Sequence, residues 1–438
     1  MANVRKVAID ALVKIENDGA YSNIVVDKLL LNSGLDSRDK AFATSIIYGT
    51  LERKKTLEYI VSKYSKTPVK KIKPFIMFTL QTALYQILFM DKIPDSAAVN
   101  EAVKIVRKSK FSNLGGFVNA VLRAFIRDEK KIVYPNETID YLSVKYSVSK
   151  DIASIFYNQY KEKASEVLEG FFALEGTMIK VNTLKISVDE LMEKLATNCE
   201  VQVHPLCSEV LVVKGAGSVR ELYGFDKGYF HIQDAASAIC AKIVDAKRDD
   251  RVLDVCSAPG GKSFSIAEYM GDSGEVLALD LYEHKIELIK NGAKRLGLNS
   301  IKSFVNDASV FRADLGKFNK VLCDLPCSGL GILGKKPEIR YKNVAFIDNL
   351  SSLQYDLLYA SKSYVEIGGL LFYSTCTLNE NENYGVVKRF LEENKEFEPF
   401  AIAKSAEKSD KDLDNTLTLF PHIHKTDGFF ISAFKRVR

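Results

Sequence analysis

Apolar residues recur at helical spacing throughout the first part of the chain, up to residue 130. One stripe contains Val4, Val7, Ala8, Ala11, Leu12 and Ile15, and another contains Leu114, Phe117, Val118, Val121, Leu122 and Phe125. Apolar positions three and four residues apart lie on one face of a helix. We therefore predict an all-α N-terminal domain over residues 1–130 with at least five helices. Asp36 and Asp95 are predicted as N-caps ahead of helices over Arg38–Tyr64 and Ala97–Lys108.

The pattern changes after the turn signal at Tyr134-Pro135-Asn136. Helical spacing returns over Glu137–Leu174, and alternation then predicts strands at Met178–Leu184 and Val210–Val213. We therefore predict a small α+β middle domain over residues 131–231.

Strands and helices alternate from Asp250 onwards, within a third predicted domain over residues 232–438. The predicted strands are Val252–Cys256, Glu275–Asp280, Ile301–Val305, Lys320–Asp324 and Leu370–Thr375, with helices from Lys262 and over Glu283–Leu296. Continuous apolar strands separated by amphipathic helices indicate a parallel sheet covered on both faces, the doubly wound α/β (Rossmann-like) class. Ligands of such sheets bind at the carboxyl ends of the strands. The charged segment Lys404–Asp414 is typical of a surface loop.

Length and composition restrict the class of protein. A chain of 438 residues with 47% hydrophobic content can bury a core in each of several domains, which excludes general disorder. The richest apolar stretch, Pro74–Met90, contains Gln81 and Gln86 and is too short for a membrane span. The first residues lack the apolar region of a secretory signal, so we expect a cytoplasmic protein with no membrane contact.

Cysteine usage bears on redox state and metal binding. The chain has 7 cysteines and no Cys-x-x-Cys pair. Cys240, Cys256, Cys323 and Cys376 lie in or beside apolar runs and are predicted to be buried. We therefore expect neither a disulfide scaffold nor a metal site.

Charge is distributed unevenly along the chain. The formal net charge is +9 over residues 1–130 and −4 over the rest, within a total of +5. A basic domain on a nearly neutral protein fits a module that binds nucleic acid, because phosphate neutralisation supplies most non-specific affinity. A solvated lysine-rich helical surface explains the charge equally well.

Carboxylates at successive strand ends point to a nucleoside-containing cofactor. The first strand leads through Asp254-Val-Cys-Ser-Ala-Pro-Gly-Gly-Lys262 into a helix N-terminus, whose free N–H groups can meet a polar or anionic ligand. This turn is neither a G-x-G-x-x-G fingerprint nor a Walker loop. Asp280 ends the second strand, where a carboxylate can accept both hydroxyls of a ribose. Asp307, after the third strand, can accept a hydrogen bond from an adenine amino group. A single aspartate after a strand is usually a helix N-cap. Asp254, Asp280 and Asp307 stand at three successive strand ends, so that explanation is insufficient here.

Two cysteines and an aspartate converge at the same edge. The fourth strand ends in Asp324-Leu-Pro-Cys327-Ser-Gly and the fifth in Tyr373-Ser-Thr-Cys376-Thr-Leu. Carbon 5 of a pyrimidine does not attack a sulfonium methyl unaided, but a thiolate added at carbon 6 turns the ring into an enamine that does. An acid near N3, such as Asp324, would stabilise that addition, and a second thiol could assist expulsion of the first. Most free cysteines are merely small buried hydrophobes, but these two stand in short polar loops at the ligand edge.

These segments resemble a known family. DVCSAPGGKS, DLPCSGLGIL with the trailing KKPEIRYK, and YSTCTLNENEN are similar to motifs of the RNA 5-methylcytosine methyltransferases of the NOL1/NOP2/Sun family. Further matches are Val181-Asn-Thr-Leu184, Gln233-Asp-Ala-Ala-Ser237 and Asp427-Gly-Phe-Phe-Ile431. Within residues 1–130, RDKAFATSIIYGT, IPDSAAVNEAVKIVRK and GGFVNAVLR look like a NusB-type RNA-binding domain. The combination is similar to the RsmB (Sun) type, and the resemblance covers nearly the whole chain.

The resemblance implies an activity and a set of site residues. It implies S-adenosylmethionine as cofactor, 16S ribosomal RNA of the small subunit as partner, and methyl transfer to C5 of a cytosine through a covalent adduct. It assigns Cys376 as the nucleophile that adds to C6 and Cys327 as the residue that aids product release. The chemistry of the addition step adds Asp324 as a further catalytic residue. The implied cofactor contacts are Cys256, Ser257, Ala258, Pro259, Gly260, Gly261, Lys262, Asp280, Asp307 and Asp324. We expect a monomer.

Two positions depart from the family pattern. Lys180 stands where the family has arginine before Val-Asn, and Tyr146-Ser-Val-Ser replaces His-Pro-x-Trp in a chain without tryptophan. We expect both departures to bear on RNA contacts of the middle domain.

Other functions fit the sequence less well. NusB-type domains also occur alone in non-catalytic RNA-binding or antitermination factors, but Asp324, Cys327 and Cys376 are all present here. An amino-directed methyltransferase needs an Asn/Asp-Pro-Pro-aromatic loop after the fourth strand, which Asp324-Leu-Pro-Cys does not supply. Hydride transfer on a dinucleotide would require the missing glycine fingerprint.

Overall fold

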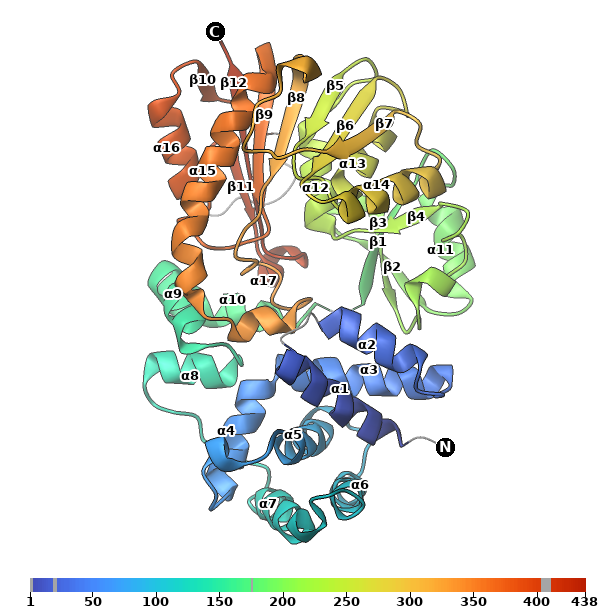
Figure 1. Ribbon diagram of the computed structural model, residues 1–438, viewed down its shortest axis with the longest axis vertical. Helices are drawn as coiled ribbons and strands as arrows, with labels where there is room; N and C mark the ends of the chain where they lie inside the picture. The colour runs from blue at the N-terminus through green and yellow to red at the C-terminus, as the bar shows by residue number, and fades with distance from the viewer. Residues whose placement is uncertain (1–2, 19–21, 175, 403–410) are drawn as a thin grey trace. The chain divides into compact units, whose positions relative to one another are not determined.

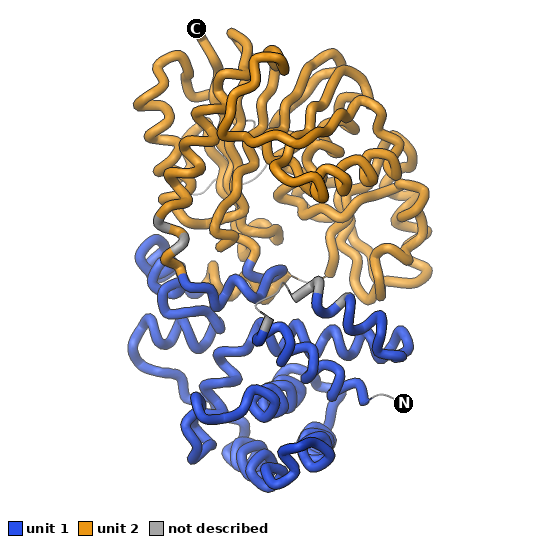
Figure 2. The backbone as a smooth tube through the Cα atoms, in the orientation of Figure 1, with its two compact units in different colours: residues 1–165, 333–343 blue, residues 166–332, 344–438 orange. Residues whose placement is uncertain are grey.

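The computed structural model describes residues 3–18, 22–174, 176–402 and 411–438. Within these ranges the chain forms two compact units (Figure 2). Unit 1 comprises residues 1–165 and 333–343, and unit 2 comprises residues 166–332 and 344–438. The division into three domains that the sequence suggests stays a prediction. Residues 404–410 of the predicted surface loop lie outside the described residues.

Unit 1 is helical, as predicted (Figure 1). Its α-helices are α1 (Val4–Asp18), α2 (Ser22–Leu31), α3 (Ser37–Glu52), α4 (Lys54–Tyr64), α5 (Pro74–Phe89), α6 (Asp95–Arg107), α7 (Gly115–Arg127), α8 (Thr138–Lys145) and α9 (Lys150–Tyr160), and α10 (Ala164–Gly170) follows. The richest apolar stretch of the sequence, which begins at Pro74, forms helix α5. This helix is central in the unit and packs against α1, α3, α4, α6 and α7. Gln81 and Gln86 are buried there and donate to the Lys54 and Thr82 carbonyls.

Two helix boundaries differ from the predictions. The predicted helix over Arg38–Tyr64 is broken at Arg53, whose backbone leaves the helical region, and the two halves pack separately as α3 and α4. Asp36 caps α3, as predicted, by accepting from the Asp39 N–H at 2.8 Å. Asp95 is not a cap, because Pro94 takes that position; the Asp95 carboxylate instead pairs with Lys130 at 2.8 Å.

The structure places residues 333–343 in unit 1. Arg340 is fully buried and donates from Nη1 to the Tyr146 carbonyl at 2.9 Å and from Nε to the Leu333 carbonyl at 3.1 Å. The Tyr341 hydroxyl donates to the Leu51 carbonyl at 2.6 Å. This short segment, which the chain reaches only after Cys327, is therefore part of the core of the helical unit.

Unit 2 contains a small antiparallel sheet in the order β2-β3-β1-β4. Its elements are β1 (Thr177–Val181), α11 (Val188–Ala196), β2 (Glu200–His204), β3 (Cys207–Lys214) and β4 (Phe230–Ile232). One face packs on α11 through Ile179, Val181, Leu191 and Leu211. The other face shares a core with α12 (Ala235–Val244) and the larger sheet through Met178, Val210 and Val212. The two sheets therefore belong to one packed unit.

The larger sheet has the order β10-β12-β9-β8-β5-β6-β7, with β11 paired to β12. Its elements are β5 (Arg251–Asp254), α13 (Gly261–Tyr269), β6 (Glu275–Asp280), α14 (Glu283–Leu296), β7 (Ile301–Val305), β8 (Phe318–Asp324), α15 (Leu350–Ser361), β9 (Val365–Thr375), α16 (Tyr384–Glu393), β10 (Phe397–Pro399), β11 (Thr416–Leu419), α17 (Pro421–His424) and β12 (Phe429–Arg436). The bounds of β6, α14 and β7 are those predicted. Strands β5 to β9 are parallel, but β10, β11 and β12 run antiparallel. The sheet is therefore mixed rather than purely parallel.

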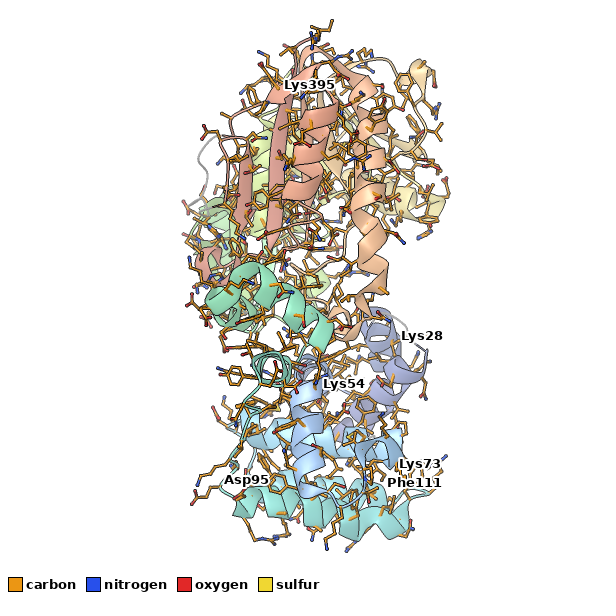
Figure 3. All side chains as sticks on the ribbon, turned by 90° about the vertical axis from the view of Figure 1, so that its left-hand side faces the viewer. Lys28, Lys54, Lys73, Asp95, Phe111 and Lys395 are labelled. Carbon is orange, nitrogen blue, oxygen red and sulfur yellow. The ribbon has the colours of Figure 1, made fainter. Side chains whose placement is uncertain are left out.

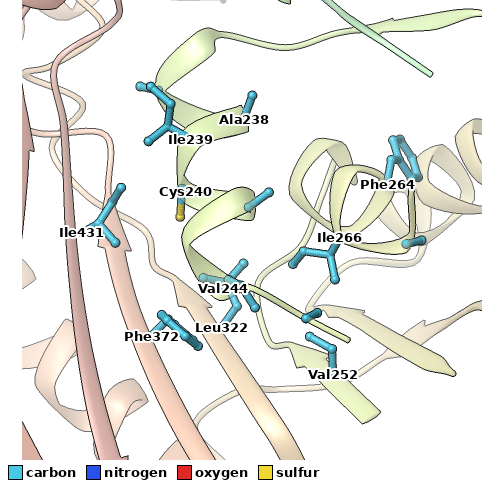
Figure 4. Packing of buried hydrophobic residues seen from close by; sticks show 14 of the residues in the cluster. Ala238, Ile239, Cys240, Val244, Val252, Phe264, Ile266, Leu322, Phe372 and Ile431 are labelled. Carbon is cyan, nitrogen blue, oxygen red and sulfur yellow. The ribbon is translucent and has the colours of Figure 1, made fainter. Parts of the chain in front are cut away.

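Alternation along each strand builds one core on each face of this sheet. Val252, Val276, Leu322 and Phe372 pack with α12, α13 and α14, as the close view in Figure 4 shows for part of this cluster. Their neighbours Leu253, Leu277, Cys323 and Tyr373 pack on the other face with residues of α15 and α16. The doubly wound arrangement is thereby confirmed. The strand order reverses between β5 and β8, the position where such folds hold their ligands.

Among the described residues, none of the helices combines the length and the apolar character that a membrane span requires.

Candidate active site

The loop between β5 and α13 contains the first group of predicted cofactor residues. Gly260 has φ +106°, and a Cβ there would lie 2.4 Å from the Phe264 ring, so both backbone and space require glycine. The Gly260 N–H donates to the Ser257 carbonyl at 2.7 Å, which closes the loop just before the helix begins at Gly261. The following N–H groups of the first turn have no partner within a helix. Cys256 is half-buried in this loop, and burial raises the pKa of its thiol well above the ordinary value.

Asp280 lies beside this loop at the end of β6. The Ala258 N–H donates to Asp280 Oδ2 at 3.2 Å, and Lys285 Nζ lies 3.2 Å from Asp280 Oδ1. The Ser257 N–H donates to the Leu279 carbonyl at 2.8 Å, which holds the loop against the end of β6. Asp280 is only 5% exposed, so its carboxylate is oriented before any ligand arrives.

Asp307 is close to Asp280 in space but is engaged in a turn of its own. The Asn306 N–H donates to the Asp280 carbonyl at 3.0 Å and brings the loop after β7 to the same edge. Asp307 Oδ1 accepts from the Ser309 N–H at 2.9 Å and the Ser309 hydroxyl at 2.7 Å. These bonds lower the pKa of Asp307 below its usual range. The contact with an adenine amino group stays a prediction.

Asp324 joins the first loop to the ends of β8 and β9. Its Oδ2 lies 2.6 Å from Lys262 Nζ, and its Oδ1 accepts from the Ser374 hydroxyl at 2.8 Å. Burial lowers the pKa of Lys262, but Asp324, Cys240 and Asp254 together raise it by more, so the pKa is raised overall. Lysine and carboxylate therefore form a charged, half-buried pair at the strand-order reversal.

The two predicted catalytic thiols touch. Cys327 follows β8, Cys376 follows β9, and their Sγ atoms are 3.1 Å apart. The hydrogen bond to Cys376 and burial together raise the pKa of Cys327 well above the ordinary value of a thiol. Both residues are half-buried, so the prediction that Cys376 is buried is wrong, as it is for Cys256. Cys240 and Cys323 are buried as predicted, and all seven cysteines are free thiols.

Close backbone packing holds Cys376 in place. The Gly331 N–H donates to the Cys376 carbonyl at 3.0 Å, and the Gly428 N–H donates to the Gly331 carbonyl at 2.7 Å. A Cβ at Gly331 would lie 1.9 Å from the Gly428 oxygen. Glycine at this position thus lets three chain segments approach behind the nucleophile candidate.

Two residues near the thiols and the cofactor loop were not singled out from the sequence. Ser374 bonds Asp324, and Glu382 is a fully buried carboxylate beside the cysteine loops. Both belong to the YSTCTLNENEN segment, so the signal was present but did not distinguish them from their neighbours. Asp254 accepts from the Ser263 hydroxyl at 2.6 Å beneath the first loop, and burial raises its pKa to about 7.

The two departures from the family pattern lie in the interior. Lys180 is fully buried, and its Nζ lies 2.8 Å from Glu268 Oε2. The same Nζ donates a hydrogen bond to the Val181 carbonyl at 3.0 Å. Tyr146 is 2% exposed in the core of unit 1. The Lys180 and Tyr146 side chains face protein rather than solvent, and the expectation that these departures bear on RNA contacts stays a prediction.

Comparisons with known proteins identify the family of the chain. The family model for the 16S rRNA methyltransferase RsmB/F matches residues 241–435, and that for the NusB family matches residues 2–127. The probable ribosomal RNA small subunit methyltransferase B of Bacillus subtilis is 33% identical and covers 99% of each chain. The protein of the same name from Synechocystis sp. is 32% identical over 100% of each chain.

Solved structures share the fold. The crystal structure of PH0851 aligns with a TM-score of 0.82 at 23% identity and covers 100% of this chain and 99% of that chain. A methyltransferase homolog protein from Pyrococcus horikoshii is 27% identical, with a TM-score of 0.61 over 69% of this chain and 99% of that chain. The two relatives and the family match over residues 241–435 together give the assignment. The chain belongs to the RsmB/F family of 16S ribosomal RNA methyltransferases, whose methyl donor is S-adenosylmethionine.

Proposed function

We propose that this protein transfers a methyl group to C5 of a specific cytosine in 16S ribosomal RNA through a covalent adduct between Cys376 and C6. The observation that carries the proposal is the contact between the Cys327 and Cys376 sulfurs, 3.1 Å apart and next to the strand that ends in Asp324. A methyltransferase acting on an amino nitrogen needs no thiol, and one acting on an activated pyrimidine carbon needs a nucleophile at this place.

The residues around the first loop fit the methyl donor. Gly260 leaves no Cβ where the loop turns into α13, and Asp280 holds an oriented carboxylate at the neighbouring strand end. We propose that Asp280 accepts from the ribose hydroxyls and that residues 256–262 hold the remainder of the molecule. S-adenosylmethionine, when bound, supplies an electrophilic methyl group.

The chemistry assigns a separate task to each thiol. The Cys376 thiolate adds to C6, the electrons of the ring double bonds move toward N3, and N3 takes up a proton that it shares with the Asp324 carboxyl group. C5 then takes up the methyl group, which would leave the donor as a neutral thioether, and N3 gives its proton back. Loss of the C5 proton restores the double bond, breaks the C6–S bond and returns the Cys376 thiolate. Because the pKa of Cys327 is raised, its thiol keeps a proton with which it can hydrogen-bond the sulfur that leaves.

Exposed lysines of unit 1 are candidates for the RNA contact. Lys70, Lys71 and Lys73 are exposed around the short helical turn at Val69–Lys71, and Lys54 and Lys73 are labelled among the side chains of this unit in Figure 3. Phosphate neutralisation by such side chains gives affinity without sequence preference. We propose that this unit holds the RNA backbone while unit 2 acts on the base.

The test separates the two thiols. Cys376→Ala should abolish 5-methylcytosine in a 16S ribosomal RNA substrate, measured by mass spectrometry of nucleosides, because no enamine can form. Cys327→Ala should accumulate a slowly migrating protein–RNA species on a denaturing gel when S-adenosylmethionine is present, and the double variant should not. Cys199→Ala, a half-buried thiol on another loop, is the matched control. Full activity in both single variants would eliminate the covalent mechanism.

A further inference from the structure

A fully buried carboxylate, that of Glu382, lies between the two cysteine loops. Its Oε2 accepts from the Ser328 N–H at 2.8 Å and from Gln354 Nε2 at 3.0 Å. Its Oε1 accepts from Asn379 Nδ2 at 2.9 Å. The donors come from the loop after β8, from α15 and from the loop after β9. One carboxylate thus connects three segments that are distant in sequence.

On the Cys327 side, this network holds the backbone on both flanks of the thiol. Ser328, whose N–H bonds Glu382, directly follows Cys327. Gln354 Nε2 also donates to the carbonyl of Pro326, which directly precedes Cys327, at 2.9 Å. The peptide groups on either side of Cys327 are therefore fixed to one carboxylate and one amide.

On the Cys376 side, Asn383, which directly follows Glu382, holds the residues on both flanks of the thiol. The Thr375 hydroxyl donates to Asn383 Oδ1 at 2.7 Å, and Asn383 Nδ2 donates to the Thr377 carbonyl at 3.0 Å. The Tyr373 hydroxyl donates to the Glu382 carbonyl. The Ser328 and Thr377 hydroxyls, one from each loop, lie 2.7 Å apart. Both loops are tied to each other and to the same short segment.

We infer that Glu382 is a positioning residue that holds the Cys327 and Cys376 thiols in contact at the reacting edge. This inference rests on the proposed function for its catalytic meaning. Burying a carboxylate costs free energy unless hydrogen-bond donors surround it. The two loops therefore have their lowest free energy in the conformation in which both present their donors to Glu382. Thiols in short loops need such support, because a shift of about 1 Å in a reacting group can slow a reaction about 100-fold.

The first measurement is the rate of methyl transfer. Glu382→Ala removes the acceptor and should lower kcat about 100-fold, with the dissociation constant for S-adenosylmethionine changed less than about twofold. Glu382→Gln keeps the length of the side chain and one acceptor oxygen for Ser328 and Gln354. It should restore kcat to within about tenfold of the parent protein.

The second measurement needs neither RNA nor activity. Alkylation of each cysteine by iodoacetamide, followed against pH by peptide mass spectrometry, reports the environment of the thiols, with Cys199 as internal reference. In Glu382→Ala the contact with Cys376 that raises the pKa of Cys327 is loosened, so the alkylation profile of Cys327 should move to lower pH. Glu268→Gln, which alters another fully buried carboxylate of unit 2, should leave this profile in place.

These readouts distinguish a failure of the inference from a failure of the proposed function. A parent protein that makes no 5-methylcytosine would refute the function, yet the alkylation profiles would still decide the role of Glu382. If circular dichroism shows that Glu382→Ala does not fold, Gln354→Met, which removes the shared donor, should shift kcat and the profile in the same direction. A folded Glu382→Ala with parental kcat and alkylation, or a Gln variant as slow as the Ala variant, would overturn the inference.

Discussion

Replacement of Asp280 by alanine should weaken S-adenosylmethionine binding at least about tenfold. The carboxylate is 5% exposed and is oriented by the Ala258 N–H and by Lys285. Two hydrogen bonds from ribose hydroxyls to such a charged acceptor are worth about 1.5–3 kcal/mol each at most. Even if water recovers half of the smaller sum, the remaining loss is about 1.5 kcal/mol, or tenfold in the dissociation constant. The change should appear in kcat/KM for the cofactor rather than in RNA binding.

Isothermal titration calorimetry of the purified variant measures this directly. Lys285→Ala is the matched control, because it removes the cation beside Asp280 but leaves the ribose acceptor in place. The Lys285 side chain is 40% exposed, so the loss of this pair should cost less than about 1 kcal/mol. Binding that is unchanged in a folded Asp280→Ala protein would show that another group holds the ribose.

Three further predictions concern RNA binding and stability. Replacing Lys70, Lys71 and Lys73 together by alanine should reduce the slope of log affinity against log salt for an RNA fragment, in fluorescence anisotropy titrations, by about 1 for each phosphate that these lysines neutralise. An unchanged slope would place the RNA-binding surface elsewhere. Arg340→Ala leaves buried carbonyls without their donor and should lower the free energy of unfolding by about 2–4 kcal/mol in urea titrations. Stability equal to the parent would contradict the structural role of this segment. Burial raises the pKa of Asp254 to about 7, above the value of about 3.9 in an unfolded chain. Between these two values the folded state binds more protons than the unfolded state. The free energy of unfolding should therefore fall as the pH rises from about 4 to about 7. Asp254→Asn should flatten that fall, and an identical pH profile would mean that Asp254 does not titrate in this range.

Much of the fold was predictable because it is encoded locally. β6, α14 and β7 have their predicted bounds, since each is an uninterrupted run of one periodicity between turn residues. The helical character of unit 1 follows in the same way from its apolar stripes. Errors arose where two local signals competed: Pro94 took the cap position assigned to Asp95, and one long helical pattern was divided at Arg53.

The chemistry-bearing residue types were also visible in the sequence. Asp280 and Asp324 end predicted parallel strands and Cys327 and Cys376 follow such strands, and parallel strands end at one edge of a sheet. That argument places the residues near one another but does not say which pairs touch. Lys262 and Asp324 are 62 positions apart in the sequence, and Cys327 and Cys376 are 49 positions apart. The order of the strands and the packing of the loops bring each pair into contact.

By itself, the sequence determined that the N-terminal part is helical and basic, that strands and helices alternate from residue 250, and which polar residues stand at the ends of those strands. Only the tertiary structure decided that Lys180 is buried against Glu268, that residues 333–343 belong to the helical unit, and that Glu382 lies between the cysteine loops. The physical reason is that periodicity and turn chemistry act over a few neighbouring residues. The partner of a buried charge is instead chosen by whichever distant donor the packed chain brings within about 3 Å.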